Sequence, residues 1–239
     1  GKGSQQEVMD VIAGMGENIV TINAGEMKRR GGRLRLSGNV TTLSPRDAER
    51  IASEIEEVEL VAPFEEKRMN AKFDNNAAET AITGSTLDFQ FIRGYRIENG
   101  EMFSEQDLKT GNRVAIIGKT AIKNLFGDED PIGQVVKVHF IPFKIIGVFE
   151  AKGVDTNGLD QDDLIFIPLP TLMNRIVNQT HVSRIFVKIS SRENIEKASE
   201  KIRELLRESH KLTDDREDDF TLVSQLDLED MKRETSELF

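Results

Sequence analysis

Residues 113–133 read RVAIIGKTAIKNLFGDEDPIG and combine a short apolar run, the dipeptide Gly118-Lys119 and a helical pattern. A strand that leads through Gly-Lys-Thr into a helix is how a nucleotide-binding phosphate loop ends. That loop also needs a glycine five residues before Gly118, but Arg113 stands there. The residues between them are apolar and largely β-branched, which favours a buried strand over a loop around phosphates. We therefore predict a strand, a helix and a turn without a bound nucleotide.

The surrounding region, roughly residues 75–165, is rich in short apolar runs separated by glycine. Runs of this length and spacing predict a β-rich subdomain with one or two short helices. Its acidic loop, residues 155–163, resembles a calcium loop but fails the EF-hand spacing. Leu159 occupies the fifth position, where a ligand is needed, and Asp160 the sixth, where glycine is needed. A polar surface loop is the simpler interpretation.

A strand–helix–strand pattern precedes this middle region. Residues 18–24 alternate as a strand does, and a second strand follows at 59–69. Between them Ser44, Pro45 and Asp47 fit the N-cap, the first position and the third position of a capped helix. The apolar face of that predicted helix consists of Ala48, Ile51, Ile55 and Val58.

The same pattern returns after the middle region. Residues 181–190 predict an inner strand, Ser190 or Ser191 caps a helix, and a last strand begins at Phe220. The apolar stripe of this helix consists of Ile195, Ala198, Ile202, Leu205 and Leu206. Two βαβ units of this size predict an α+β fold, a split ferredoxin-like sandwich that carries the middle region as an insertion.

Both ends of the chain have amphipathic helical stripes. Gly1 to Ser4 resemble a cloning remnant, so we expect a piece excised from a longer protein. The stripes consist of Val8, Val11, Ile12 and Met15 near the start and of Leu228, Met231 and Leu238 near the end. They either pack on the domain or are stubs of two longer helices. The predicted domains are 1–17 and 226–239 as stalks, 18–74 with 166–225 as the discontinuous subdomain, and 75–165 as the insertion.

The composition excludes several functions. A net charge of −10 argues against a nucleic-acid-binding surface, and the absence of cysteine excludes disulfides and thiolate chemistry. His139, His181 and His210 are far apart and show no metal-binding spacing. No apolar run approaches the ~20 residues that span a bilayer. We predict no catalytic residue, metal site or cofactor.

Several ordered segments carry a family resemblance. VAIIGKTAIKNLFGDEDPIGQVVKV and FKIIGVFE resemble the extracytoplasmic core domain of MacB-type, FtsX-like ABC transporter permeases. GMGENIVTI, LSPRDAERIASEIEEVELVAP, GYRIENGEMFSEQD and LIFIPLPTLMNRI are similar to family landmarks in the same order. The resemblance spans about residues 11–225.

The resemblance implies a split ferredoxin-like porter subdomain with an inserted β-rich sabre subdomain. The domain would lie outside the cytoplasmic membrane, periplasmic or at the cell surface, between the first two membrane helices of the permease. Implied partners are those helices, a cytoplasmic ABC ATPase, and a second permease chain in a homodimer or heterodimer. Some relatives also use a periplasmic adaptor or another envelope protein. Nucleic acid is not among the partners.

The implied function is mechanical and not enzymatic. The domain would transmit ATP-driven conformational change and so drive export or release of a substrate, or engage a partner outside the membrane. The seven apolar stripe residues at the two ends are the predicted lever. One alternative is a stand-alone extracytoplasmic ligand-binding or sensing module that uses a cleft between the subdomains. Another is an enzyme using Lys119. The residues do not specify the substrate, the partner, the envelope type or whether the ATPase is fused.

Overall fold

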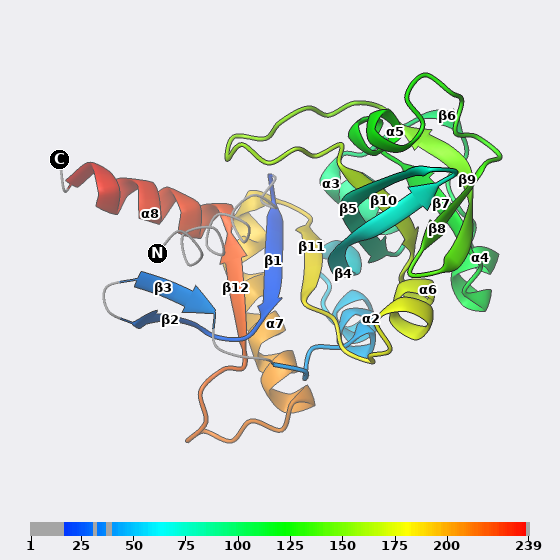
Figure 1. Ribbon diagram of the computed structural model, residues 1–239. Helices are drawn as coiled ribbons and strands as arrows, with labels where there is room; N and C mark the ends of the chain where they lie inside the picture. Colours follow the sequence, from blue (N-terminus) through cyan, green and yellow to red (C-terminus); the bar gives the residue numbers. More distant parts are fainter. Residues whose placement is uncertain (1–16, 31–32, 37–39, 238–239) are drawn as a thin grey trace. The chain divides into compact units, whose positions relative to one another are not determined.

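The computed structural model describes the chain in three ranges, residues 17–30, 33–36 and 40–237. The chain divides into two compact units (Figure 1). Unit 1 consists of two segments, one ending at Pro63 and one beginning at His181. Unit 2 is the continuous stretch Phe64–Thr180 between them. Unit 2 is therefore an insertion in unit 1.

Unit 1 contains a sheet with the strand order β12-β1-β11-β4. These strands are β1 (Ile19–Ala24), β4 (Val58–Phe73), β11 (Arg184–Ile189) and β12 (Phe220–Ser224). Strand β1 pairs antiparallel with both neighbours, so that Ile22 lies opposite Ile185 on one side and Leu222 on the other. Strand β11 lies inside the sheet, as its apolar residues on both faces predict. A separate hairpin consists of β2 (Met27–Arg30) and β3 (Arg33–Leu36).

Helix α2 (Pro45–Glu54) connects the first two sheet strands of unit 1. It begins as predicted, because Ser44 is its N-cap and Asp47 completes the capping box. It ends at Glu54, so the prediction that Val58 continues its apolar face is wrong. Val58 instead begins β4.

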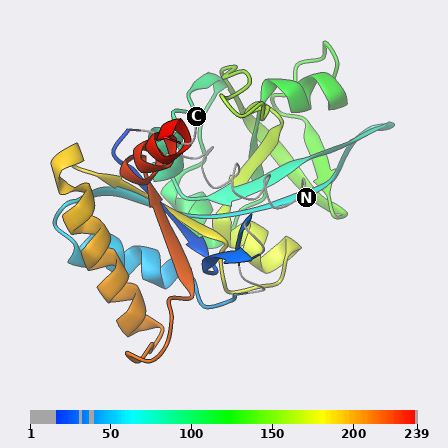
Figure 2. The ribbon, with the colours of Figure 1, turned by 90° about the vertical axis from the view of Figure 1, so that its left-hand side faces the viewer.

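Helix α7 (Ile195–Ser209) contacts α2, β1 and β12, and Figure 2 shows it lying alongside β12. All five residues of its predicted apolar stripe are buried. The predicted serine cap is wrong, because a short 3-10 turn at Arg192–Asn194 precedes the helix and makes Asn194 its N-cap.

Unit 2 is a closed ring of strands in the order β4-β5-β10-β7-β9-β8, in which β8 returns to pair with β4. Besides β4, the ring contains β5 (Asn76–Ser85), β7 (Val114–Ile117), β8 (Val135–Val138), β9 (Ile141–Phe149) and β10 (Leu164–Pro168). A closed ring has no open sheet edge of its own. Its core includes the fully buried side chains of Ile82, Ile117, Val136, Phe143 and Ile165. Strand β6 (Ile97–Gly100) is added to β9.

Short helices complete this β-rich unit, namely α3 (Asp88–Arg93), α4 (Glu105–Thr110), α5 (Lys119–Leu125) and α6 (Leu169–Thr171). The stretch 113–133 forms β7, α5 and the turn before β8, as its pattern predicts. Leu125 and Phe126 are buried, and Gly127 adopts a φ of +60° just after the helix. Glycine takes this conformation without steric cost.

The boundaries between the units differ from those predicted at 74/75 and 165/166. Strand β4 is one continuous strand, and its later part pairs with β5 and β8 in the ring of unit 2. Strand β10 pairs with β5 and β7 and so also belongs to unit 2. The observed divisions therefore follow Pro63 and Thr180.

Candidate functional site

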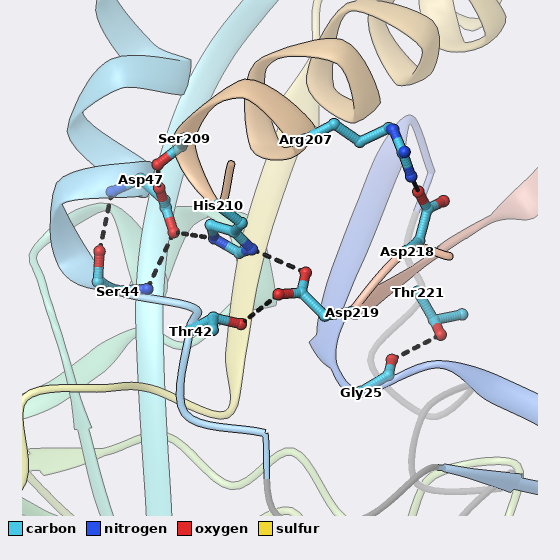
Figure 3. Close-up of polar contacts among 10 residues, drawn as sticks. All are labelled: Gly25, Thr42, Ser44, Asp47, Arg207, Ser209, His210, Asp218, Asp219 and Thr221. Atoms are coloured by element: carbon cyan, nitrogen blue, oxygen red, sulfur yellow. Dashed lines mark hydrogen bonds and ion pairs between the residues drawn. The ribbon is translucent and has the colours of Figure 1, made fainter. Parts of the chain in front are cut away.

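Unit 1 contains a buried polar cluster centred on His210 (Figure 3). His210 directly follows α7, Asp47 lies in the first turn of α2, and Asp219 directly precedes β12. Nε2 of His210 lies 2.8 Å from Oδ2 of Asp47, and Nδ1 lies 2.7 Å from Oδ1 of Asp219. The side chains of His210 and Asp47 are only 3% and 2% exposed. The cluster thus joins α2 and α7 to the start of β12.

Further donors hold the two carboxylates. Ser209 Oγ donates to Oδ1 of Asp47 at 2.6 Å, and the backbone N–H of Ser44 donates to Oδ2 at 3.1 Å. Thr42 Oγ1 donates to Oδ2 of Asp219 at 2.7 Å. Asp47 therefore caps α2 and binds the end of α7 at the same time, so the start of one helix and its packing on the other depend on one carboxylate.

The electrostatics of the cluster favour a charged His210. Both ring nitrogens face carboxylates, and only an imidazolium carries a proton on each nitrogen. Burial alone would lower the pKa of His210, but the hydrogen bonds with Asp47 and Asp219 outweigh burial and raise that pKa. Burial would raise the pKa of Asp47, but the hydrogen bonds from His210 and Ser209 lower it. The ends of α7 and α2 favour the same charges through their dipoles.

This geometry suits a cross-link and not a catalyst. A general base needs a nitrogen within reach of a substrate, but both nitrogens of His210 are bound inside the unit. Ser209 donates to Asp47 and not to the imidazole, so the usual nucleophile–base pair is not formed. Among the residues the structure describes, no group of three or more His, Asp or Glu side chains could hold a metal ion.

Sequence reasoning missed this cluster. Asp47 and His210 are 163 residues apart, and the spacing of the histidines along the chain bears only on a metal site. The only local signals were Asp47 in a capping box and the acidic stretch that ends at Asp219. Neither signal indicates that these side chains meet.

Helix α8 (Gln225–Glu237) follows β12 directly (Figure 1). The backbone N–H of Ser224 donates to Oδ2 of Asp227 at 2.8 Å, as the reciprocal bond of a capping box does at the start of a helix. The backbone N–H of Asn18, next to β1, donates to Oε1 of Gln225 at 2.7 Å. The guanidinium of Arg192 donates twice to the carboxylate of Glu229, at 2.9 and 2.7 Å. The start of α8 is therefore fixed to three elements of unit 1.

Two of the seven predicted stalk residues, Leu228 and Met231, lie half-buried on α8. The other five lie outside the described residues, namely Val8, Val11, Ile12, Met15 and Leu238. Among the helices of the described ranges, none has the length and apolar character needed to cross a membrane.

The Gly118-Lys119-Thr120 segment forms hydrogen bonds and an ion pair within unit 2. The backbone N–H of Gly118 donates to the carbonyl of Leu164 at 3.0 Å, and that of Thr120 donates to the carbonyl of Asp162 at 3.2 Å. Lys119 forms an ion pair with a glutamate of β6. A phosphate loop turns such N–H groups toward its ligand. Here both N–H groups donate to carbonyl groups of the protein itself.

The carboxylates of Asp155 and Asp162 in the acidic loop 155–163 accept hydrogen bonds from backbone N–H groups in and near the loop. Oδ1 of Asp155 accepts the backbone N–H groups of Asn157 and Leu159 at 2.8 and 3.0 Å. The carboxylate of Asp162 accepts two further backbone N–H groups at 2.7 and 2.9 Å. These bonds stabilise the loop's own conformation, as expected of a polar surface loop.

Comparison with known sequences gives a family match. Residues 1–205 match the family described as MacB-like periplasmic core domain. The macrolide export ATP-binding/permease protein MacB of Marinobacter nauticus is 32% identical over 235 residues, which cover 98% of this chain and 35% of that protein. The chain thus spans about a third of the length of the curated relatives that it matches.

Solved structures show the same mixed α/β fold. The periplasmic region of MacB from Actinobacillus actinomycetemcomitans aligns with a TM-score of 0.75 and 25% identity, covering 97% of this chain and 98% of that one. The extracellular domain of the noncanonic ABC-type transporter YknZ from Gram-positive bacteria aligns with a TM-score of 0.70 and 18% identity, covering 87% and 100%. The second similarity is one of fold alone.

Proposed function

Because this chain belongs to the family of MacB-like periplasmic core domains, we propose that it transmits ATP-driven movement to the outer side of the cytoplasmic membrane. The chain is an extracytoplasmic domain of an ABC transporter permease. In the proposal, movement starts at a cytoplasmic ATPase and passes through membrane-spanning helices into this domain. The domain then drives export or release of a substrate, or engages a partner.

We infer that unit 1 is a split ferredoxin-like porter subdomain and unit 2 the inserted sabre subdomain. Numbered along the chain, the sheet strands of unit 1 are β1, β4, β11 and β12, so the observed order is fourth, first, third, second. Helices α2 and α7 connect the first pair and the last pair. Two βαβ units of a ferredoxin-like fold produce this arrangement.

One observation carries the mechanical proposal, namely that the start of β1 and the end of β12 lie side by side. Val20 lies opposite Ser224 in the antiparallel pair, and the Asn18–Gln225 hydrogen bond links the residues just beyond it. A displacement of α8 therefore pulls directly on two adjacent strands. A packed unit responds to such a pull as a rigid body.

The proposal assigns residues 1–17 and 226–239 to stalks that lead toward the membrane. In the proposal, the full-length permease pairs with a second permease chain. Outside the membrane it contacts an adaptor or another envelope protein. The domain acts as a lever and docking surface and not as a catalyst. The fully bonded imidazole of His210 supports that view. No observation on the described residues favours the sensing-module alternative.

The test uses the full-length transporter in lipid nanodiscs, with Leu228→Asp and Met231→Asp combined. We expect ATP hydrolysis to continue, whereas the nucleotide-dependent change in hydrogen exchange across β1 and β12 disappears. The reason is that charge on the half-buried face of α8 disfavours its packing and so weakens the mechanical connection.

Glu234→Gln is the matched control, because Glu234 is exposed on the same helix. This variant should keep the nucleotide-dependent exchange. The lever proposal fails if the double variant keeps the response as well. It also fails if the wild-type transporter shows no change in β1 and β12 when nucleotide binds.

A further inference from the structure

Strands β8 and β9 of unit 2 are joined by the two-residue turn His139-Phe140. Both residues have positive φ, +50° for His139 and +65° for Phe140. Turns of this kind favour asparagine and glycine, because bulkier side chains are strained in this conformation. Phe140 is nonetheless 93% exposed, so its ring gains almost no burial within the unit. The turn is therefore strained, and burial of the Phe140 ring does little to offset that strain.

A groove of about 780 Å³ lies beside this turn, on the strands β4, β5 and β8. The apolar part of its lining consists of Met69, Ala71, Ala77, Val135 and Phe140. Val135 is 48% exposed, although neighbouring β8 residues point into the core. The volume is in the range of sites that bind small molecules or short side-chain clusters. Phe140 and Val135 thus form an apolar surface that is concave and open.

The charged side chains of the same groove are two lysines and one carboxylate, that of Asp74. Lys72 on β4 and Lys137 on β8 are directly opposite each other in the antiparallel pair. Like charges in this position repel and destabilise a sheet. Neither lysine forms an ion pair with any residue that the structure describes.

We propose that this groove binds an extended acidic segment of a partner protein. An apolar side chain of the segment packs against Phe140 and Val135, and its carboxylates lie near Lys72 and Lys137. Binding buries the exposed ring and neutralises the lysine repulsion, which offsets both destabilising features. The groove is concave, so an extended polypeptide segment can follow its lining, with carboxylates near the lysines and an N–H group near Asp74, whereas a planar lipid surface cannot. These features favour a polypeptide over a membrane.

This binding role lies wholly within unit 2 and does not depend on the stalk coupling proposed for unit 1. It can therefore be measured on the purified chain by fluorescence anisotropy. The probes are labelled peptides of equal length in three panels: acidic with apolar residues, basic with apolar residues, and acidic without apolar residues. We expect the first panel to bind best and its affinity to fall with added salt.

Lys72→Glu and Phe140→Ser should each weaken binding of the first panel by at least about tenfold, the effect of losing an interface hot spot. Lys123→Glu on α5 and Phe91→Ser on α3 are matched controls outside the groove lining. Phe91 is 65% exposed, so its replacement tests a second exposed phenylalanine of unit 2. Both controls should leave the affinity unchanged.

A turn variant separates binding from folding. His139→Asn combined with Phe140→Gly supplies the preferred turn residues, so unit 2 should unfold at a higher temperature while peptide binding is lost. The proposal is overturned if the first panel shows no preference, or if the groove variants behave like the controls. It is also overturned if phosphatidylglycerol vesicles bind in a Phe140-dependent way and displace the peptide.

Discussion

Replacing His210 with alanine is expected to lower the free energy of unfolding of unit 1 by about 3 to 5 kcal/mol, the usual cost of removing one partner from a buried ion pair. The substitution leaves the carboxylates of Asp47 and Asp219 at one site without their shared cation. Denaturant-dependent hydrogen exchange in α2 and α7 measures this loss separately from unit 2.

His139→Asn is the matched control, because His139 lies on an exposed turn of unit 2. It should leave the stability of unit 1 unchanged. Adding Asp219→Asn to His210→Ala should recover part of the loss, since one of the two facing carboxylates is then neutral. The double-mutant cycle would accordingly be non-additive. A loss below about 1 kcal/mol for His210→Ala would place the cluster among surface ion pairs and contradict the buried cross-link.

The same cluster predicts how the stability of unit 1 depends on pH. The folded pKa of His210 is raised above its ordinary 6.5, because hydrogen bonds to Asp47 and Asp219 outweigh the effect of burial. Its stabilisation is therefore complete below pH 6.5 and is lost as pH rises through the raised value. The folded pKa of Asp47 is below its ordinary 3.8, so that stabilisation is lost only as pH falls below 3.8 through the lowered value.

The contribution of charged His210 and Asp47 to the stability of unit 1 should thus be greatest between pH 3.8 and 6.5. Urea unfolding across a pH series, followed in α7, tests the prediction. In His210→Ala the decline above pH 6.5 should flatten, whereas in the His139→Asn control it should persist. An equal decline in the wild type and His210→Ala would assign the pH dependence to other groups.

The features that the sequence predicts correctly are those that local rules determine. The capping box of α2 lies within four consecutive residues, and the stripe of α7 repeats with the helical period. The strand and helix of residues 113–133 are also recognised locally, from the apolar run before Gly118 and the helical pattern after it. In each case the residues that decide the structure are neighbours along the chain.

The features that the sequence does not predict depend on register and on distant pairing. The predicted division of the chain differs from the observed one, because β4 is uninterrupted in sequence although it contributes to both units. Lys72 and Lys137 become adjacent only when β8 closes the ring on β4. His210 meets Asp47 only after α2 and α7 pack together. Composition and periodicity do not predict these contacts, because they do not determine the register of strand pairing. A shift of one residue in that register would abolish the contact between the lysines.

Gly118→Ala is expected to destabilise unit 2 by about 3 kcal/mol or more, as overpacking against backbone does at its upper range. A Cβ atom at this position would lie 2.2 Å from the carbonyl oxygen of Asp162 and 2.7 Å from Cδ2 of Leu164. The carbonyl of Asp162 cannot easily retreat, because it accepts the N–H of Thr120. Strands β7 and β10 would have to separate at this end. Thermal unfolding and hydrogen exchange in β7 and β10 measure the effect.

The expected loss of stability in Gly118→Ala can be compared with the losses in two nearby substitutions, Gly127→Ala and Lys119→Ala. Gly127→Ala introduces a side chain with nothing within 4 Å, so it costs only the positive-φ strain of about 1 to 2 kcal/mol.

Lys119→Ala removes a partly exposed ion pair and should cost at most about 1 kcal/mol. In a phosphate loop the lysine would control nucleotide binding, whereas here calorimetry should detect no ATP binding to the purified chain. If Lys119→Ala abolished measurable ATP binding, or Gly118→Ala cost no more than Gly127→Ala, Gly118 would belong to a ligand loop and not to the packed junction of two strands.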